Sequence, residues 1–140
     1  MINLDIHKAF DSVHWGFLQE LLVHLKLPPH FIKLVMTCVQ SVSFDLHVNG
    51  MMGGAFPGGR GLKQGDPLSP LLSVLVMEYF SHLMIHASAQ DGFRYHPYCK
   101  KLQLTHLIFA DDVLLFSEAH EPTLRAVKTA LDAFHASSGL

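Results

Sequence analysis

An apolar segment with two adjacent aspartates at its centre constrains the fold of this chain more than any other feature of the sequence. Residues 104–116 are rich in apolar side chains, and Asp111 and Asp112 break the run at its middle. This pattern predicts a hairpin with both acids at its turn. Like charges repel and apolar surroundings desolvate them, so the pair is costly unless a cation offsets it. Carboxylate oxygens suit Mg²⁺ or Mn²⁺ in that role.

A third carboxylate ends another predicted strand, near the start of the chain. Residues 2–6 alternate apolar and polar side chains, which predicts a short half-buried strand with Asn3 and Asp5 on one face. If this strand shares a sheet with the hairpin, Asp5 converges with Asp111 and Asp112, and three carboxylates suffice for a two-metal site. The alternative is an exposed polar turn and an unrelated acid on a strand. The acids alone do not distinguish the two-metal site from this alternative.

The remaining periodicity predicts helices interleaved with antiparallel hairpins. The expected elements are a helix over 13–25, a helix that starts after Pro29, a strand over 44–48 followed by the turn signal Asn49-Gly50, a helix from Pro70 to about Ala87 and a helix from Pro122. Hairpins imply antiparallel strand pairs. The predicted fold class is therefore α+β, with helices packed on one face of a small antiparallel sheet.

The composition limits the kind of protein this can be. At 140 residues one domain is the default. Charged residues make up 16%, well below the roughly 25% of an ordinary soluble domain, so the chain reads as an inner piece of something larger. A net charge of −2 predicts no basic patch able to hold nucleic acid alone. No run approaches about 18 uninterrupted apolar residues, so no membrane partner is expected.

A glycine-rich segment lies in the middle of the chain. Seven of the ten glycines lie between Gly50 and Gly65, which predicts a loop with a permissive backbone. From residue 60 it reads RGLKQGDPLSP, which combines two cations and an amide with a helix start. Glycine lets the backbone approach a flat ligand, and a helix N-terminus favours anions. An ordinary strand-to-helix connection explains the same residues, so the loop alone does not distinguish a ligand-binding site from a simple connection.

Together, three segments resemble the reverse transcriptases of non-LTR (LINE-type) retrotransposons, in particular those of plant genomes. They are LDIHKAFDSV at 4–13, RGLKQGDPLSP at 60–70 and FADD at 109–112, and they are similar to the palm motifs A, B and C in the family's order. The resemblance covers nearly the whole chain. It implies that residues 1–140 are a partial reverse transcriptase domain with a polymerase palm fold. The implied activity is extension of a DNA 3′-hydroxyl on an RNA template.

The resemblance also implies a catalytic role for the three acids. Asp5 and Asp111 match the main metal ligands, and Asp112 matches the third catalytic carboxylate beside them. These residues would hold two Mg²⁺ ions, with Mn²⁺ as a substitute. One ion would activate the primer 3′-hydroxyl, and the other would bind the triphosphate and stabilise the leaving pyrophosphate.

Other motif residues match substrate-binding or structural positions. Phe10 matches the aromatic gate that stacks under the incoming sugar and rejects a 2′-hydroxyl. Gln64 and Gly65 match positions that pack against the incoming nucleotide and the template base. We assign structural roles to Asp11, which would cap a helix start, and to Asp66, which would order a loop.

The implied partners are an RNA template, a DNA primer and deoxynucleoside triphosphates. The family also carries fingers, thumb and endonuclease regions that this sequence lacks, so the chain is expected to be a palm fragment that does not polymerise alone. One alternative is a non-catalytic remnant of a decayed retrotransposon. Another is a generic two-metal phosphohydrolase, which leaves the glutamine-glycine loop unexplained. Nuclear action is implied for the parent element, and the compartment of this chain is left open.

Histidines suggest a zinc site as a further alternative. His82 and His86 lie four residues apart on the long predicted helix, with His96 and Cys99 downstream. However, the chain has 11 histidines and no cysteine pair at finger spacing, so this spacing is an unsurprising coincidence. We interpret Trp15 as a core residue.

Overall fold

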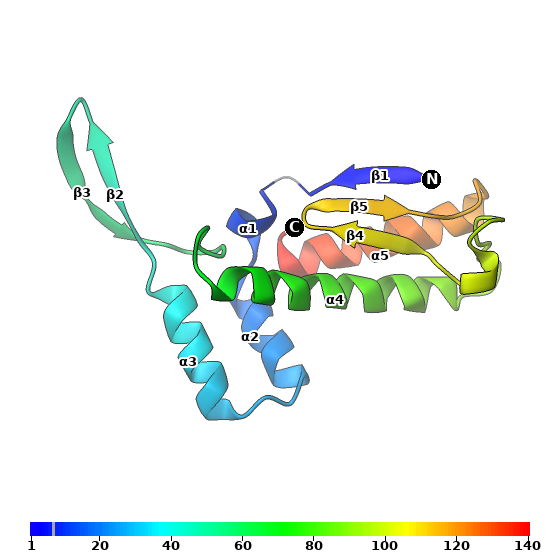
Figure 1. Ribbon diagram of the computed structural model, residues 1–140, viewed down its shortest axis with the longest axis horizontal. Coiled ribbons are helices and arrows are strands. Elements are labelled where there is room, and N and C mark those ends of the chain that lie inside the picture. The colour runs from blue at the N-terminus through cyan, green and yellow to red at the C-terminus, as the bar shows by residue number, and fades with distance from the viewer. Residues whose placement is uncertain (7) are drawn as a thin grey trace.

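The computed structural model describes residues 1–6 and 8–140 (Figure 1). In chain order its elements are β1 (Ile2–Asp5), α1 (Ala9–Ser12), α2 (Trp15–His24), α3 (Pro29–Gln40), β2 (Ser43–Val48), β3 (Met51–Pro57), α4 (Leu68–Ser88), the 3-10 helix η1 (Lys100–Leu102), β4 (His106–Phe109), β5 (Asp112–Leu115) and α5 (Glu121–Ser138). Two small antiparallel sheets stand among these helices. The α+β class predicted from the sequence is confirmed.

One sheet has three strands in the order β1-β5-β4, both pairs antiparallel. Its central strand β5 buries Val113 and Leu115, which are each 1% exposed. Leu4 and Ile108 lie directly opposite Val113 and therefore share its face. Figure 1 shows α4 and α5 on the same side of this sheet. One face of the sheet is therefore covered by helices, and the other face is open.

Helix α4 forms the centre of the hydrophobic core. Its buried residues include Leu72, Val76 and Phe80, and Phe80 meets Phe134 of α5 edge to face at 5.1 Å between ring centroids. By length and composition alone, α4 would also be able to cross a membrane, although polar residues interrupt its apolar sequence. The core helix of a soluble protein meets the same description. Here α4 packs against α5 and β4.

The second sheet is the hairpin of β2 and β3, which projects away from the helices (Figure 1). Asn49 and Gly50 have φ angles of 51° and 79°, as a type I′ turn requires, so the predicted turn is confirmed. Every residue of both strands is exposed. The prediction of a loop from Gly50 to Gly65 is wrong over β3, because pairing with β2 holds this glycine-containing segment extended.

Candidate active site

Two aspartates from opposite ends of the chain lie side by side on the open face of the three-stranded sheet. Asp5 is directly opposite Asp112 across the β1–β5 pair, and Phe109 is opposite Asp112 on the other side. Directly opposed residues of antiparallel strands point to the same face. The register therefore forms a row of Asp5, Asp112 and Phe109 across the sheet, and all three are exposed. Asp5 lies on the same face as the hairpin acid, as predicted.

Asp111 lies in the two-residue turn between β4 and β5. Its carbonyl oxygen accepts a hydrogen bond of 3.0 Å from the backbone N–H of Ile6, which ties the turn to the end of β1. The other turn residue, Ala110, has a φ of 55°, a left-handed conformation that residues other than glycine rarely adopt. Such backbone strain clusters at ligand-binding and catalytic sites.

The three acids do not gather into one ligand cluster within the described part of the chain. Across residues 1–6 and 8–140, no three histidine, cysteine, aspartate or glutamate side chains converge as metal ligands. The expected shared set of Asp5, Asp111 and Asp112 is therefore not seen in this arrangement, and His7 of motif A lies outside the described residues. The donor set still fits a divalent cation, because Mg²⁺ is commonly held by one or two carboxylates together with waters and substrate phosphates.

The glycine loop is locked onto the α1 region by three hydrogen bonds. The backbone N–H of Gly61 donates to the carbonyl of Val13 at 2.8 Å, and that of Leu62 donates to Phe10 at 2.6 Å. The indole Nε1–H of Trp15 donates to the Gly61 carbonyl at 2.7 Å. Residue 61 must be glycine, since its φ is 91° and a Cβ would lie 2.7 Å from the carbonyl oxygen of Asp11. Motifs A and B therefore form one rigid unit.

Sequence reasoning missed the role of Trp15. Its half-buried ring does pack against the core, as expected, but its N–H also fixes the loop. A signal existed, because a buried indole N–H needs an acceptor and the chain has one tryptophan beside motif A. The partner 46 residues away could not be identified from spacing.

A cleft of about 450 Å³ opens beside this junction. It is lined by Asp11, Val42, Phe44, Arg60, Gly61, Leu62, Lys63 and Gln64. Gln64 is thus placed in a concave site with two cations beside it. Gly65 is exposed with a φ of 88°, and open space surrounds the position where a Cβ would be.

The two other motif acids were assigned structural roles, with different outcomes. Asp66 does order its loop, because its Oδ1 accepts a 2.8 Å hydrogen bond from the backbone N–H of Leu68 at the start of α4. Ser69 adds a 2.6 Å bond from its hydroxyl to the carbonyl of Lys63. The prediction for Asp11 is wrong. Helix α2 begins after His14 with no side-chain cap, while Asp11 lies inside α1 and lines the cleft.

Phe10 is half-buried and packs against the hydrophobic core. The described cleft beside Asp112 is lined by Asn3, Leu107, Ile108, Phe109, Asp112 and Leu114, so Phe10 does not share it. Burial of the ring against the core accounts for this orientation, since contact with apolar neighbours is favourable. Phe109 is the aromatic ring that stands beside Asp112, and it is 83% exposed.

A hydrogen-bonded histidine anchors the strand that leads to the acid turn. His106 Nε2 lies 2.9 Å from the hydroxyl oxygen of Ser81, and Nδ1 lies 2.8 Å from that of Thr105. Since the Ser81 hydroxyl donates to the carbonyl of Met77, it accepts from Nε2–H, and Nδ1 accepts from Thr105. Burial lowers the pKa of His106, and nearby Glu78 partly opposes this. The neutral imidazole thus ties β4 to α4.

The comparison with protein families matches the whole chain, residues 1–140, to the family described as reverse transcriptase (RNA-dependent DNA polymerase). A Pol polyprotein of the R2 retrotransposable element of Drosophila melanogaster is 33% identical over 116 residues, which is 83% of this chain and 10% of the relative. An R2 Pol polyprotein of Nasonia vitripennis is 32% identical over 137 residues, 98% of this chain and 13% of the relative. The chain thus spans about a tenth of these relatives' length.

A shorter relative is an uncharacterized mitochondrial protein of Arabidopsis thaliana. It is 41% identical over 68 residues, which is 46% of this chain and 54% of the relative.

The histidines and cysteine considered for zinc gain no support from the described structure, since no three such side chains converge there.

Proposed function

The chain belongs to the reverse transcriptase family, and from this membership we propose that residues 1–140 form part of the palm of an RNA-directed DNA polymerase. The observation that carries the proposal is the placement of Asp5 directly opposite Asp112, next to the strained turn that holds Asp111. Acids of motifs A and C, 107 positions apart in the sequence, meet on one open sheet face. A generic phosphohydrolase would not account for the motif B loop, which is hydrogen-bonded to the α1 region that follows Asp5 in the sequence.

The family implies dependence on a divalent metal, and we propose Mg²⁺, with Mn²⁺ able to replace it. Asp5 and Asp111 would be its main ligands, and Asp112, which lies directly opposite Asp5 on the sheet face, would be the third carboxylate beside them. When bound, the metal supplies positive charge that stabilises the developing charge on the transferring phosphoryl group. In the proposed reaction the primer 3′-oxygen forms a bond to the α-phosphorus of a deoxynucleoside triphosphate, and pyrophosphate leaves.

The cleft around motif B would position the nucleotide and the template. Gln64 and Gly65 would pack against the incoming nucleotide and the template base, and the open space at Gly65 supports a close backbone approach. Arg60 and Lys63 in the same region offer positive charge to phosphates. Phe10 would act as the sugar gate, a role that requires its half-buried ring to face the nucleotide when substrate is bound.

The proposed partners are an RNA template, a DNA primer and deoxynucleoside triphosphates, held by a larger polyprotein of the kind seen in the relatives. The chain's own charge of −2 gives little affinity for a primer–template through counterion release. We therefore expect the 140-residue chain by itself not to extend a primer.

A chimera tests the proposed function directly. The chain would replace the matching region of the Drosophila R2 polyprotein, and extension of a DNA primer on an RNA template would be followed with Mg²⁺. Asp5→Asn, Asp111→Asn and Asp112→Asn should each lower the rate by a hundredfold or more, because charge stabilisation is the main contribution to phosphoryl transfer. Asp45→Asn in the exposed hairpin is the matched control and should leave the rate unchanged.

A non-catalytic remnant is the second candidate. The lack of a three-carboxylate cluster among the described residues favours it. The control is a second chimera, in which the matching region of another R2 relative is inserted at the same junctions. If the control is active and the chimera with this chain is inactive, the chain is a non-catalytic remnant. Activity that survives all three aspartate changes would overturn the assignment of the acids.

A further inference from the structure

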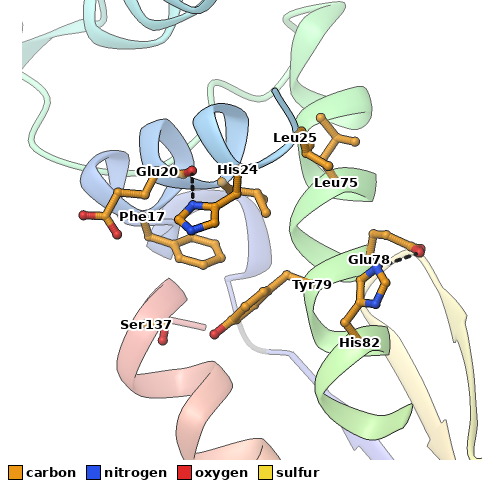
Figure 2. A pocket seen from close by; sticks show the side chains of 10 residues that line it. Phe17, Glu20, His24, Leu25, Leu75, Glu78, Tyr79, His82 and Ser137 are labelled. Atoms are coloured by element: carbon orange, nitrogen blue, oxygen red, sulfur yellow. Dashed lines mark hydrogen bonds and ion pairs between the residues drawn. The ribbon is translucent and has the colours of Figure 1, made fainter. Parts of the chain in front are cut away.

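A second concave site lies between α2, α4 and α5, away from the proposed active site (Figure 2). It has a volume of about 540 Å³, within the range of clefts that bind ligands. Its apolar lining comprises Phe17, Leu21, Leu25, Leu75 and Tyr79. The rings of Phe17 and Tyr79 meet edge to face with centroids 5.1 Å apart. None of the lining residues belongs to a strand or to the motif B loop.

Polar side chains surround this apolar floor, and the charged ones are acidic. Figure 2 shows Glu20 and Glu78 on opposite sides of the two rings. His24 lies beside Glu20, and its Nδ1–H donates to the Glu20 carbonyl at 2.9 Å. His82 Nε2 is 3.7 Å from a carboxylate oxygen of Glu78. The lining contains no lysine or arginine, so at neutral pH the cleft presents negative charge on two sides of an apolar centre.

Exposed apolar surface continues from the cleft along α4. Leu71 and Val74 are 65% and 66% exposed, and they lie one helical turn before Leu75 and Glu78. Leu25 at the cleft edge is 45% exposed. A contiguous apolar patch bordered by polar groups is typical of an interaction surface.

We propose that this cleft binds a basic amphipathic segment of a protein partner. An apolar side chain of the segment would sit on Phe17 and Tyr79, and flanking arginines would pair with Glu20 and Glu78. Arginine suits these positions because its guanidinium pairs with carboxylates in a bidentate fashion. The two carboxylates repel phosphate, so nucleic acid does not fit this cleft. Nucleic acid is the proposed partner of the active site, which is a separate part of the molecule.

Peptide titration tests the proposal. The probe is a capped twelve-residue helical peptide with two central leucines and one arginine on each side. The comparison peptide carries citrulline, which has the same shape without the charge. Binding to the 140-residue chain would be measured by calorimetry and by NMR shifts of the cleft residues. We expect the arginine peptide to bind about fivefold to tenfold more tightly than the citrulline peptide.

Variants of the chain locate the interaction. The double variant Glu20→Gln, Glu78→Gln should remove the advantage of the arginine peptide while leaving the citrulline peptide unaffected. The matched control Glu118→Gln, Glu121→Gln changes the charge equally but lies away from the cleft and should have no effect. Leu25→Ser should weaken both peptides. The proposal is overturned if both glutamate pairs act equally, if neither peptide shifts the cleft residues, or if a twelve-nucleotide RNA shifts them instead.

Discussion

The two antiparallel sheets follow the same local rules but lie in opposite environments. In the three-stranded sheet, Val113 and Leu115 alternate with outward residues and are each 1% exposed. In the β2–β3 hairpin, Phe44, Leu46 and Val48 alternate in the same way and are 50–52% exposed. Alternation therefore specifies a strand with one apolar face, while the elements that pack against this face decide whether it is buried.

This difference determines where a functional group can stand. Because α4 and α5 lie on one side of the three-stranded sheet (Figure 1), its other face can carry Asp5 and Asp112 on a supported base. A two-stranded hairpin without such support is marginally stable in water. We therefore expect the two sheets to respond very differently to equivalent substitutions.

Leucine truncation should show the largest contrast. Leu115→Ala removes a fully buried side chain from β5 and should lower the free energy of unfolding by about 2–5 kcal/mol. Leu46→Ala in the hairpin should change it by no more than about 0.5 kcal/mol. Urea unfolding followed by circular dichroism measures both. Equal losses would mean that the hairpin face is covered in solution.

Glycine substitution should give the next largest contrast, between the junction loop and the hairpin. Gly61→Ala would place a Cβ 2.7 Å from the Asp11 carbonyl oxygen, and we expect a loss of about 2–4 kcal/mol from strain and overpacking. Gly54 also has a positive φ, 102°, but no atom lies within 4 Å of its Cβ position. Gly54→Ala should therefore cost only about 1–2 kcal/mol. Thermal unfolding of the two variants, measured side by side, separates the clash from the conformational cost.

The histidine that ties β4 to α4 should make the stability of the helix-backed sheet depend on pH. Burial lowers the pKa of His106 in the folded state, so the unfolded chain binds the proton more readily. The contribution of neutral His106 to the free energy of unfolding is fully present above the pKa of histidine in the unfolded chain, about 6.5. This contribution is lost as the pH falls below that value. His106→Gln should flatten this decline, at a cost of about 1 kcal/mol at pH 8 from lost hydrogen bonds. A variant with an unchanged slope between pH 7 and 5 would exclude His106 as the source.

Relief of charge repulsion should give the smallest effect. Asp5 and Asp112 are directly opposite, and like charges in that position are destabilising, so Asp112→Asn should raise the free energy of unfolding by about 0.2–1 kcal/mol. Asp45 lies opposite Ala55 in the hairpin, so Asp45→Asn should change nothing. Added Mg²⁺ should stabilise the unsubstituted chain and not the Asp112→Asn variant. Equal stabilisation of both by Mg²⁺ would argue against a cation between these acids.

Several elements were predictable because their signals are local. The Asn49-Gly50 turn needs two residues with positive φ, and these are the residue types that adopt it. Apolar periodicity identified the helices that became α2, α3, α4 and α5 to within a few residues at their starts. Helix α1 and the 3-10 helix η1 were missed because four and three residues are too few to show a period.

The sequence by itself determined the Asn49-Gly50 turn, the four longer helices, and that two acids stand at the centre of an apolar hairpin. Only the tertiary structure decided that Asp5 lies opposite Asp112, that Gly61 and Trp15 join the two motifs, and that Phe10 packs toward the core. Turns and periodicity depend on neighbouring residues, whose propensities act within a few positions. Strand register, close backbone approach and burial depend on residues tens of positions apart, and these meet only when the helices pack on one face of the sheet.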